Sequence, residues 1–205
     1  KFSIDPSSGA LALLSAPDYE IPSDAGSDNT YEVIVRASDG VLFDEQTITV
    51  GITNVNEFSP VIISNGGSPT LSVDVMENQT AVAEVNATDA DGETLTYSIS
   101  GGADQSKFSI DPSSGLLVFV SAPDFESPTD QGGDNVYEVT IRASDGSLHD
   151  EQVISVKVSN VAQAPVITSN GGGETGSLSV QENQTAVTTV TATDGENESA
   201  PSNEA

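Results

Sequence analysis

Short stretches rich in β-branched residues recur along the chain, separated by clusters of Gly, Pro, Asn and Asp. Within these stretches apolar and polar positions alternate, as in residues 135–144, where Tyr137, Val139 and Ile141 are separated by polar side chains. A two-residue period is typical of strands with one buried face. Since no segment has a convincing 3.6-residue period, the pattern predicts an all-β protein.

The sequence also repeats itself. The nine residues from Lys1 to Gly9 recur from Lys107 to Gly115, and 36 of the 55 positions are identical when 1–55 is aligned with 107–161. A second match, Glu77 to Val82 with Glu182 to Val187, sets a repeat length of about 105 residues. We therefore predict four parts: the C-terminal half of one repeat (1–57), a complete repeat (58–163), the N-terminal part of a third (164–194) and a disordered tail (195–205).

The complete repeat contains seven predicted strands. They are 61–64 continued by 71–76, then 80–88, 94–99, 107–110, 115–120, 135–144 and 150–159. Seven short strands in about 105 residues are typical of an immunoglobulin-like β-sandwich. We thus expect tandem, immunoglobulin-like, seven-strand Greek-key β-sandwiches.

Charge narrows the possible functions. The chain has 32 acidic and 5 basic residues, a formal net charge of −27. Nucleic-acid binding needs clustered Lys and Arg, so we expect no nucleic-acid partner, and the scattered basic residues form no patch for an anionic membrane. Neither do we expect direct insertion into a membrane, because no apolar run approaches about 18 residues. The many negative charges repel one another, so we expect bound cations to neutralise them if compact domains are to form.

Enzymatic activity is not expected. The chain has no Cys and a single His, His149, so it offers neither a thiol nucleophile nor a zinc cluster. Paired carboxylates could in principle serve a glycosidase, but here they repeat along the chain instead of marking one unique cleft.

The acidic residues fall at the ends of the predicted strands. If successive strands run antiparallel, Glu77, Asp124 and Glu126 lie at the end of the sandwich where the chain leaves. Stacked repeats would then bring these carboxylates against those of the next repeat, which follow 80–88 and 135–144. Ca²⁺ resolves such repulsion, since it binds about six to eight oxygen ligands from carboxylates, amides and carbonyls.

Five motifs now show a family resemblance. They are Glu77-Asn78, Asp89-Ala90-Asp91, Asp124-Phe125-Glu126, Ala143-Ser144-Asp145-Gly146 and the linker Asn54-Val55-Asn56-Glu57-Phe58-Ser59-Pro60. In order and spacing they resemble the motifs of cadherin repeats over about residues 1–194. The long loop after Glu126 and the short Asp91-Gly92-Glu93 turn are more similar to bacterial cadherin-like repeats, so a bacterial surface protein is expected.

The resemblance implies calcium ligands at two junctions between repeats. The first junction would use Asp18, Glu20, Asn54, Asn56, Glu57, Asp89, Asp91 and Asp145. The second would use Glu77, Asp124, Glu126, Asn160 and Asp194. The linker of the second junction reads Asn160-Val161-Ala162-Gln163, in which two of the ligand positions have lost or weakened the oxygen that would bind calcium. We therefore expect roughly one to three ions at the first junction and poorer binding at the second.

The function that follows is a calcium-rigidified adhesive or spacer module of a cell-surface or secreted protein, with calcium and homophilic or heterophilic protein partners outside the cell. Two alternatives remain open. One is a carbohydrate-binding module of a polysaccharide-degrading system, although we expect Tyr97, Phe108 and Tyr137 in the core, which leaves few aromatic residues such as Tyr19 and Phe125 for sugars. The other is a head-to-tail filament, in which complementary half-repeats of two chains pair by strand addition.

Overall fold

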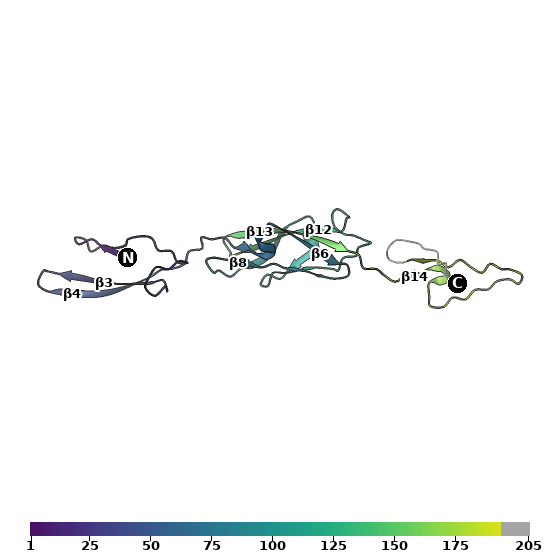
Figure 1. Ribbon diagram of the computed structural model, residues 1–205, viewed down its shortest axis with the longest axis horizontal. Helices are drawn as coiled ribbons and strands as arrows, with labels where there is room; N and C mark the ends of the chain where they lie inside the picture. The colour runs from purple at the N-terminus through teal and green to yellow at the C-terminus, as the bar shows by residue number, and fades with distance from the viewer. Residues whose placement is uncertain (194–205) are drawn as a thin grey trace.

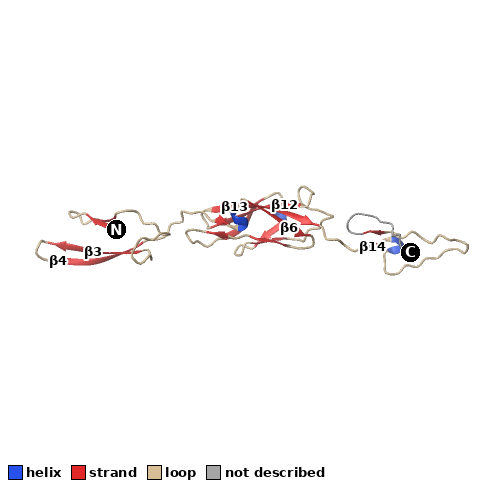
Figure 2. Cartoon of the chain, in the orientation of Figure 1, coloured by secondary structure: helices blue, strands red, loops and turns tan. Residues whose placement is uncertain are grey.

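The computed structural model describes residues 1–193 as an elongated row of three parts (Figure 1). The described residues are almost wholly strand and loop (Figure 2), with three short 3-10 helices: η1 (Ser64–Gly67), η2 (Gln105–Lys107) and η3 (Ser169–Gly171). Among these residues, no helix has the length and apolar character that crossing a bilayer requires.

The first part contains four strands in two antiparallel pairs. They are β1 (Phe2–Ile4) with β2 (Leu11–Leu13), and β3 (Thr30–Ser38) with β4 (Phe43–Gly51). The third part contains β14 (Val166–Ile167) paired with β15 (Ala192–Thr193).

The central part has nine strands. They are β5 (Val61–Ile62), β6 (Thr70–Met76), β7 (Ala81–Glu84), β8 (Ala87–Thr88), β9 (Thr96–Gly101), β10 (Phe108–Ile110), β11 (Leu116–Phe119), β12 (Val136–Ser144) and β13 (His149–Ser159). One sheet has the order β6-β13-β12-β9 and the other β10-β11-β7, with β5 and β8 forming a further pair. Each of the seven predicted strands is present, two of them in two pieces.

The first predicted strand of the repeat changes partner along its length. Its initial piece, β5, pairs antiparallel with β8, and after the η1 turn its second piece, β6, pairs parallel with β13. Gln152 stabilises this turn, because its side-chain amide donates to the carbonyls of Ser64 at 3.1 Å and Ser68 at 2.6 Å. The strand therefore joins the two layers at one edge of the sandwich.

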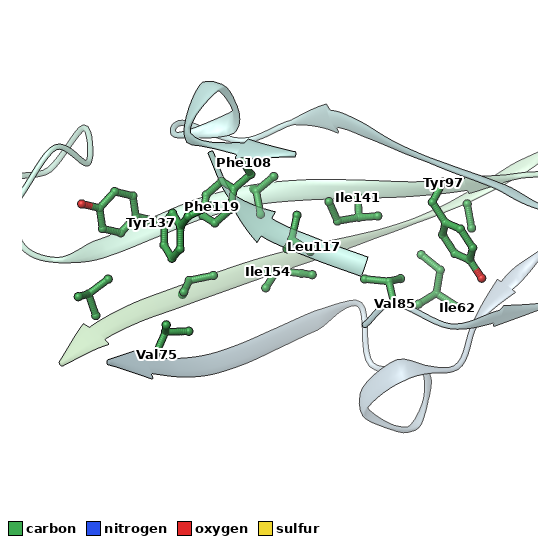
Figure 3. Packing of buried hydrophobic residues seen from close by; sticks show 14 residues of the cluster. Ile62, Val75, Val85, Tyr97, Phe108, Leu117, Phe119, Tyr137, Ile141 and Ile154 are labelled. Carbon is green, nitrogen blue, oxygen red and sulfur yellow. The ribbon is translucent and has the colours of Figure 1, made fainter. Parts of the chain in front are cut away.

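The core lies between the layers of the central part (Figure 3). Alternate residues of β12, namely Tyr137, Val139, Ile141 and Ala143, are 0–1% exposed, as the two-residue period predicts. At one end Tyr137 meets the stacked rings of Phe108 and Phe119 edge-on, and Tyr97 closes the other end beside Ile62 and Val85 (Figure 3). The packed core fixes the position of the loops at both ends of the central repeat. The candidate ligands lie at these two ends.

Candidate metal centre

The carboxylate of Asp91 attaches the first linker to the central repeat. Asp91 follows β8 and is 9% exposed, and its Oδ2 accepts the backbone N–H of Glu57 at 3.0 Å and of Phe58 at 2.7 Å. Charged acceptors make stronger hydrogen bonds than neutral ones. Asp91 therefore fixes the course of the linker as it enters the repeat.

Two neighbouring aspartates hold their own loops in the same way. Asp89 Oδ1 accepts the N–H of Asp91 at 2.8 Å, and Asp145 Oδ1 accepts those of Ser147 and Leu148, both at 2.6 Å. Burial opposes ionisation of Asp145, but these two backbone donors and the side chain of Asn56 together lower its pKa below the ordinary value. Asp89, Asp91 and Asp145 thus each use one oxygen to shape the backbone.

The other oxygens of these groups have no donor. Among the described residues, the first junction contains buried side-chain oxygens without a hydrogen-bond partner on Glu20, Asn54, Asn56, Asp89, Asp91, Glu93 and Asp145. A buried acceptor left without a donor costs roughly 1–3 kcal/mol, and most such atoms in proteins are satisfied. Carboxylate and amide oxygens that lack donors are the ligands that a hard cation prefers. The residues present therefore fit a calcium ion.

Three acidic side chains line the other side of this junction. Asp18, Glu20 and Glu57 share a cavity of about 70 Å³. The pKa of Glu20 is raised above its ordinary value, chiefly by burial and then by the negative charges of Asp91, Asp18 and Glu57. Carboxylates from both repeats and from the linker thus repel one another here, and a divalent cation would remove the repulsion.

Glu93 belongs to this cluster, although the motif comparison did not include it. Oxygens of Asp89, Asp91 and Glu93 all lie within 4.8 Å of one another. Burial is the main cause that raises the pKa of Glu93, followed by the nearby side chain of Asp89 and the charges of Asp91 and Asp89. In the sequence, carboxylates stand at every second position, at Asp89, Asp91 and Glu93. Because Asp91-Gly92-Glu93 was interpreted as a turn, Glu93 was not included among the predicted ligands.

The second junction is built around Glu77. This side chain is 2% exposed, and its oxygens, Oε2 and Oε1, accept the backbone N–H groups of Phe125 at 3.1 Å and Val161 at 2.8 Å. Oxygens of Glu77, Asp124 and Glu126 lie within 4.8 Å of one another, as the strand alternation predicted. Glu77 thereby links the end of β6 to the loop after β11 and to the second linker.

The remaining predicted residues of this junction are less enclosed. Asp124 is exposed, and its Oδ1 accepts the N–H groups of Glu126 at 3.0 Å and Ser127 at 3.1 Å. Asn160 is exposed and directly precedes Val161. Asp194 and the predicted disordered tail lie outside the described residues.

Comparison with known proteins gives a consistent result. The family model described as Cadherin domain matches residues 71–159. Human Protocadherin Fat 1 is 31% identical over 193 residues, and the Drosophila melanogaster Fat-like cadherin-related tumor suppressor homolog is 30% identical over 192 residues. The matches cover 90% and 92% of this chain but only 4% of each relative, so the chain spans a small part of their length.

Solved structures show the same fold. The crystal structure of mouse Cadherin-23 EC22-24 has a TM-score of 0.54 and 25% identity, and the match covers 78% of this chain and 50% of that one. The Protocadherin gammaB7 EC3-6 cis-dimer structure has a TM-score of 0.59 at 23% identity, with 95% and 49% covered, and supports the fold alone. The predicted immunoglobulin-like β-sandwich is thereby confirmed.

The central repeat carries the similarity to cadherins. The resemblance to bacterial-type repeats gains no support, since the relatives named above are animal proteins. The family model, the sequence relatives and the two-layer fold all agree on the broader family. Residues 71–159 of this chain match the Cadherin domain model, and the chain is similar to cadherins in sequence and in fold.

Proposed function

We propose that this chain is a calcium-binding, calcium-rigidified adhesive or spacer module of an extracellular or cell-surface protein. The observation that carries the proposal is the set of buried oxygens without donors at the first junction. The family supports it, because the relatives are cadherins and protocadherins, a class of calcium-dependent adhesion proteins. That class also favours protein partners, homophilic or heterophilic, over enzymatic activity.

The proposed ligands are the residues that the cadherin motifs indicated. At the first junction they are Asp18, Glu20, Asn54, Asn56, Glu57, Asp89, Asp91 and Asp145; at the second they are Glu77, Asp124, Glu126, Asn160 and Asp194. We place the repeat boundaries at 57/58 and 163/164, so that each ligand set takes members from two repeats and from the linker between them.

Rigidity would follow from this division of the ligands. Bound calcium would supply the positive charge that the clustered carboxylates lack. Glu57 belongs to the linker, Glu20 to the repeat above and Asp91 to the repeat below, so bending the junction would separate groups that share one counter-charge. In the ion-free chain these same groups repel one another, which favours bent and separated arrangements.

The two alternatives gain no support. Tyr97, Phe108 and Tyr137 are 8%, 5% and 1% exposed, which confirms their place in the core and leaves few aromatic side chains to stack on a sugar. The relatives are adhesion proteins, and this favours neither a polysaccharide-binding module nor a subunit of a head-to-tail filament.

A calcium titration by calorimetry, combined with thermal melting, tests the proposal. With dissociation constants of about 10⁻⁴–10⁻³ M, 10 mM calcium should stabilise the fold by about 1.4–2.7 kcal/mol per site through mass action. Magnesium at the same concentration is the matched control, and we expect it to stabilise less, because it demands a tighter octahedral geometry. No binding heat together with an unchanged melting temperature would contradict the proposal.

A further inference from the structure

Glu93 occupies a position that the cadherin motifs do not assign to calcium. It follows Asp91 by two residues, at the end of the short turn that enters β9. Its Oε1 accepts a hydrogen bond of 3.1 Å from the side-chain amide of Asn54, and its Oε2 is buried without a donor. Glu93 therefore resembles the neighbouring aspartates, because one of its oxygens accepts a hydrogen bond and the other has no donor.

We propose that Glu93 is an additional ligand for the cation in the first junction, and that Asn54 is the neutral linker residue that holds it there. This inference rests on the proposed calcium binding and adds a residue pair to it.

The burial of Asp91 is a second reason, besides the clustering of three carboxylates, to expect a cation between Asp89, Asp91 and Glu93. Asp91 is nine-tenths buried, and its Oδ1 has no donor, although Oδ2 has two. An oxygen from each of Asp89, Asp91 and Glu93 lies within 4.8 Å of the others. Three carboxylates at this separation repel strongly when ionised, and no Lys or Arg forms a salt bridge with them in the described part of the chain. A cation in their midst satisfies the free oxygens and offsets the repulsion.

Asn54 explains why Glu93 can be accommodated. Its side-chain nitrogen donates both to the backbone carbonyl of Asp91 at 3.0 Å and to Glu93 Oε1 at 3.1 Å. A carboxylate at position 54 would place one acceptor against another. A neutral amide donates instead, and its own Oδ1 remains buried without a donor, as a ligand oxygen would be. The amide at position 54 and the carboxylate at position 93 thus complement each other.

The chemical consequence concerns affinity. Affinity of oxygen sites for calcium rises with the number of charged ligands and with the rigidity of the site. Glu93 adds one negative charge, and its bond to Asn54 ties the linker to the turn that carries two of the aspartates. We therefore expect this junction to bind calcium more tightly than the cadherin motif residues alone would allow.

Calorimetric calcium titrations of the chain and four variants test the inference at neutral pH. Glu93→Gln removes the charge and should weaken binding at the tightest site by at least about tenfold. Asn54→Asp should weaken calcium binding as well, because it places the new carboxylate at position 54 against that of Glu93. The double variant N54D/E93Q should recover most of the loss, since the amide introduced at position 93 can donate to the carboxylate introduced at position 54. Glu84→Gln is the matched control, because Glu84 is an exposed carboxylate on β7 away from the junction.

The outcomes separate this inference from the broader proposal. If the unaltered chain binds no calcium, the proposed function itself fails. If it binds calcium and Glu93→Gln binds as tightly as Glu84→Gln, the ligand role of Glu93 is overturned while the function stands. If Glu93→Gln weakens binding but the double variant recovers nothing, the partnership with Asn54 is overturned. Melting curves in chelator show whether each variant keeps its fold, so a loss of affinity is not mistaken for unfolding.

Discussion

The two linkers occupy equivalent places in the repeat but differ in the groups that they contribute. The first runs Asn54-Val55-Asn56-Glu57 and the second Asn160-Val161-Ala162-Gln163, so an amide and a carboxylate of the first become a methyl group and a neutral amide in the second. Glu57 lines a cavity with Asp18 and Glu20. The corresponding acids of the second junction, Asp124 and Glu126, adjoin a linker without any charge. Because Asp18 and Glu20 correspond to Asp124 and Glu126, the comparison teaches that the linkers themselves make the two junctions differ in charge.

The junctions also show two uses of a buried carboxylate. Glu77 gives both oxygens to backbone N–H groups and so joins a strand, a loop and a linker. Asp91 gives only Oδ2 to the backbone and keeps Oδ1 without a donor. The first arrangement supports the fold without an ion, whereas the second leaves one buried oxygen that the proposed cation would satisfy. Substitutions at the two sites should therefore change different measured quantities.

The largest effect on stability is expected for Glu77→Ala. The substitution leaves the N–H groups of Phe125 and Val161 without their acceptor in a site where the side chain is 2% exposed, and it should lower the free energy of unfolding by about 2–4 kcal/mol. Glu77→Gln retains one acceptor oxygen and should cost less. Chemical denaturation of the chain in chelator measures both. A loss below about 0.5 kcal/mol for Glu77→Ala would show that Glu77 does not support the fold in the way described.

A smaller effect, on affinity instead of stability, is expected for Gln163→Glu. This change gives the second linker the carboxylate that Glu57 provides in the first, beside the cluster of Glu77, Asp124 and Glu126. Calcium should then bind at the second junction about tenfold more tightly, because the charge of the ligand set rises. The reverse change, Glu57→Gln, should weaken the first junction to a similar degree.

Calorimetry with a charge-matched control distinguishes a local effect from a general one. Gln46→Glu adds the same charge on exposed β4 and should leave calcium affinity unchanged. Equal gains for Gln46→Glu and Gln163→Glu would mean that overall charge, and not the linker position, governs binding.

Much of the fold could be predicted because the alternation of apolar residues directly reflects burial. Residues 135–144 alternate cleanly, and β12 occupies 136–144. Residues 80–88 were expected as one strand but form β7 and β8, because the Val85 N–H bonds to Gly115 and the Asn86 carbonyl accepts from Ile63. Such a change of hydrogen-bonding partners depends on residues distant in sequence. The periodicity of apolar residues does not reveal it.

The candidate site was predictable to a different extent. Motif spacing placed Glu77 with Asp124 and Glu126, and Asp89 with Asp91, as the structure shows. It missed Glu93, whose role depends on the amide of Asn54 across 39 positions of sequence. It could not show which oxygen of each carboxylate is held by the backbone and which is left free, since that depends on loop geometry.

The smallest effect is expected at Asp111, which separates turn chemistry from ion binding. Its Oδ1 accepts the N–H groups of Ser113 at 3.0 Å and Ser114 at 2.8 Å and the Ser114 hydroxyl at 3.0 Å, a pattern typical of Asp in a turn. The backbone of Ser114, that of Ser113 and the Ser114 hydroxyl lower the pKa of Asp111 below its ordinary value of 3.8. Asp111→Asn should therefore melt slightly below the unaltered chain at neutral pH and bind calcium equally well.

The pH dependence of that difference follows from the direction of the shift. A carboxyl whose pKa is lower in the folded state stabilises the fold above its unfolded pKa, and this contribution disappears as the pH falls through the folded pKa. Asp111→Asn lacks the charge at every pH, so the gap in melting temperature between it and the unaltered chain should be full at pH 7 and should close as the pH falls below about 3.8. Melting curves in chelator at descending pH measure the gap. A gap that persists at low pH, or a change in calcium affinity at pH 7, would place Asp111 with the junction carboxylates and erase the distinction between the two kinds of acid.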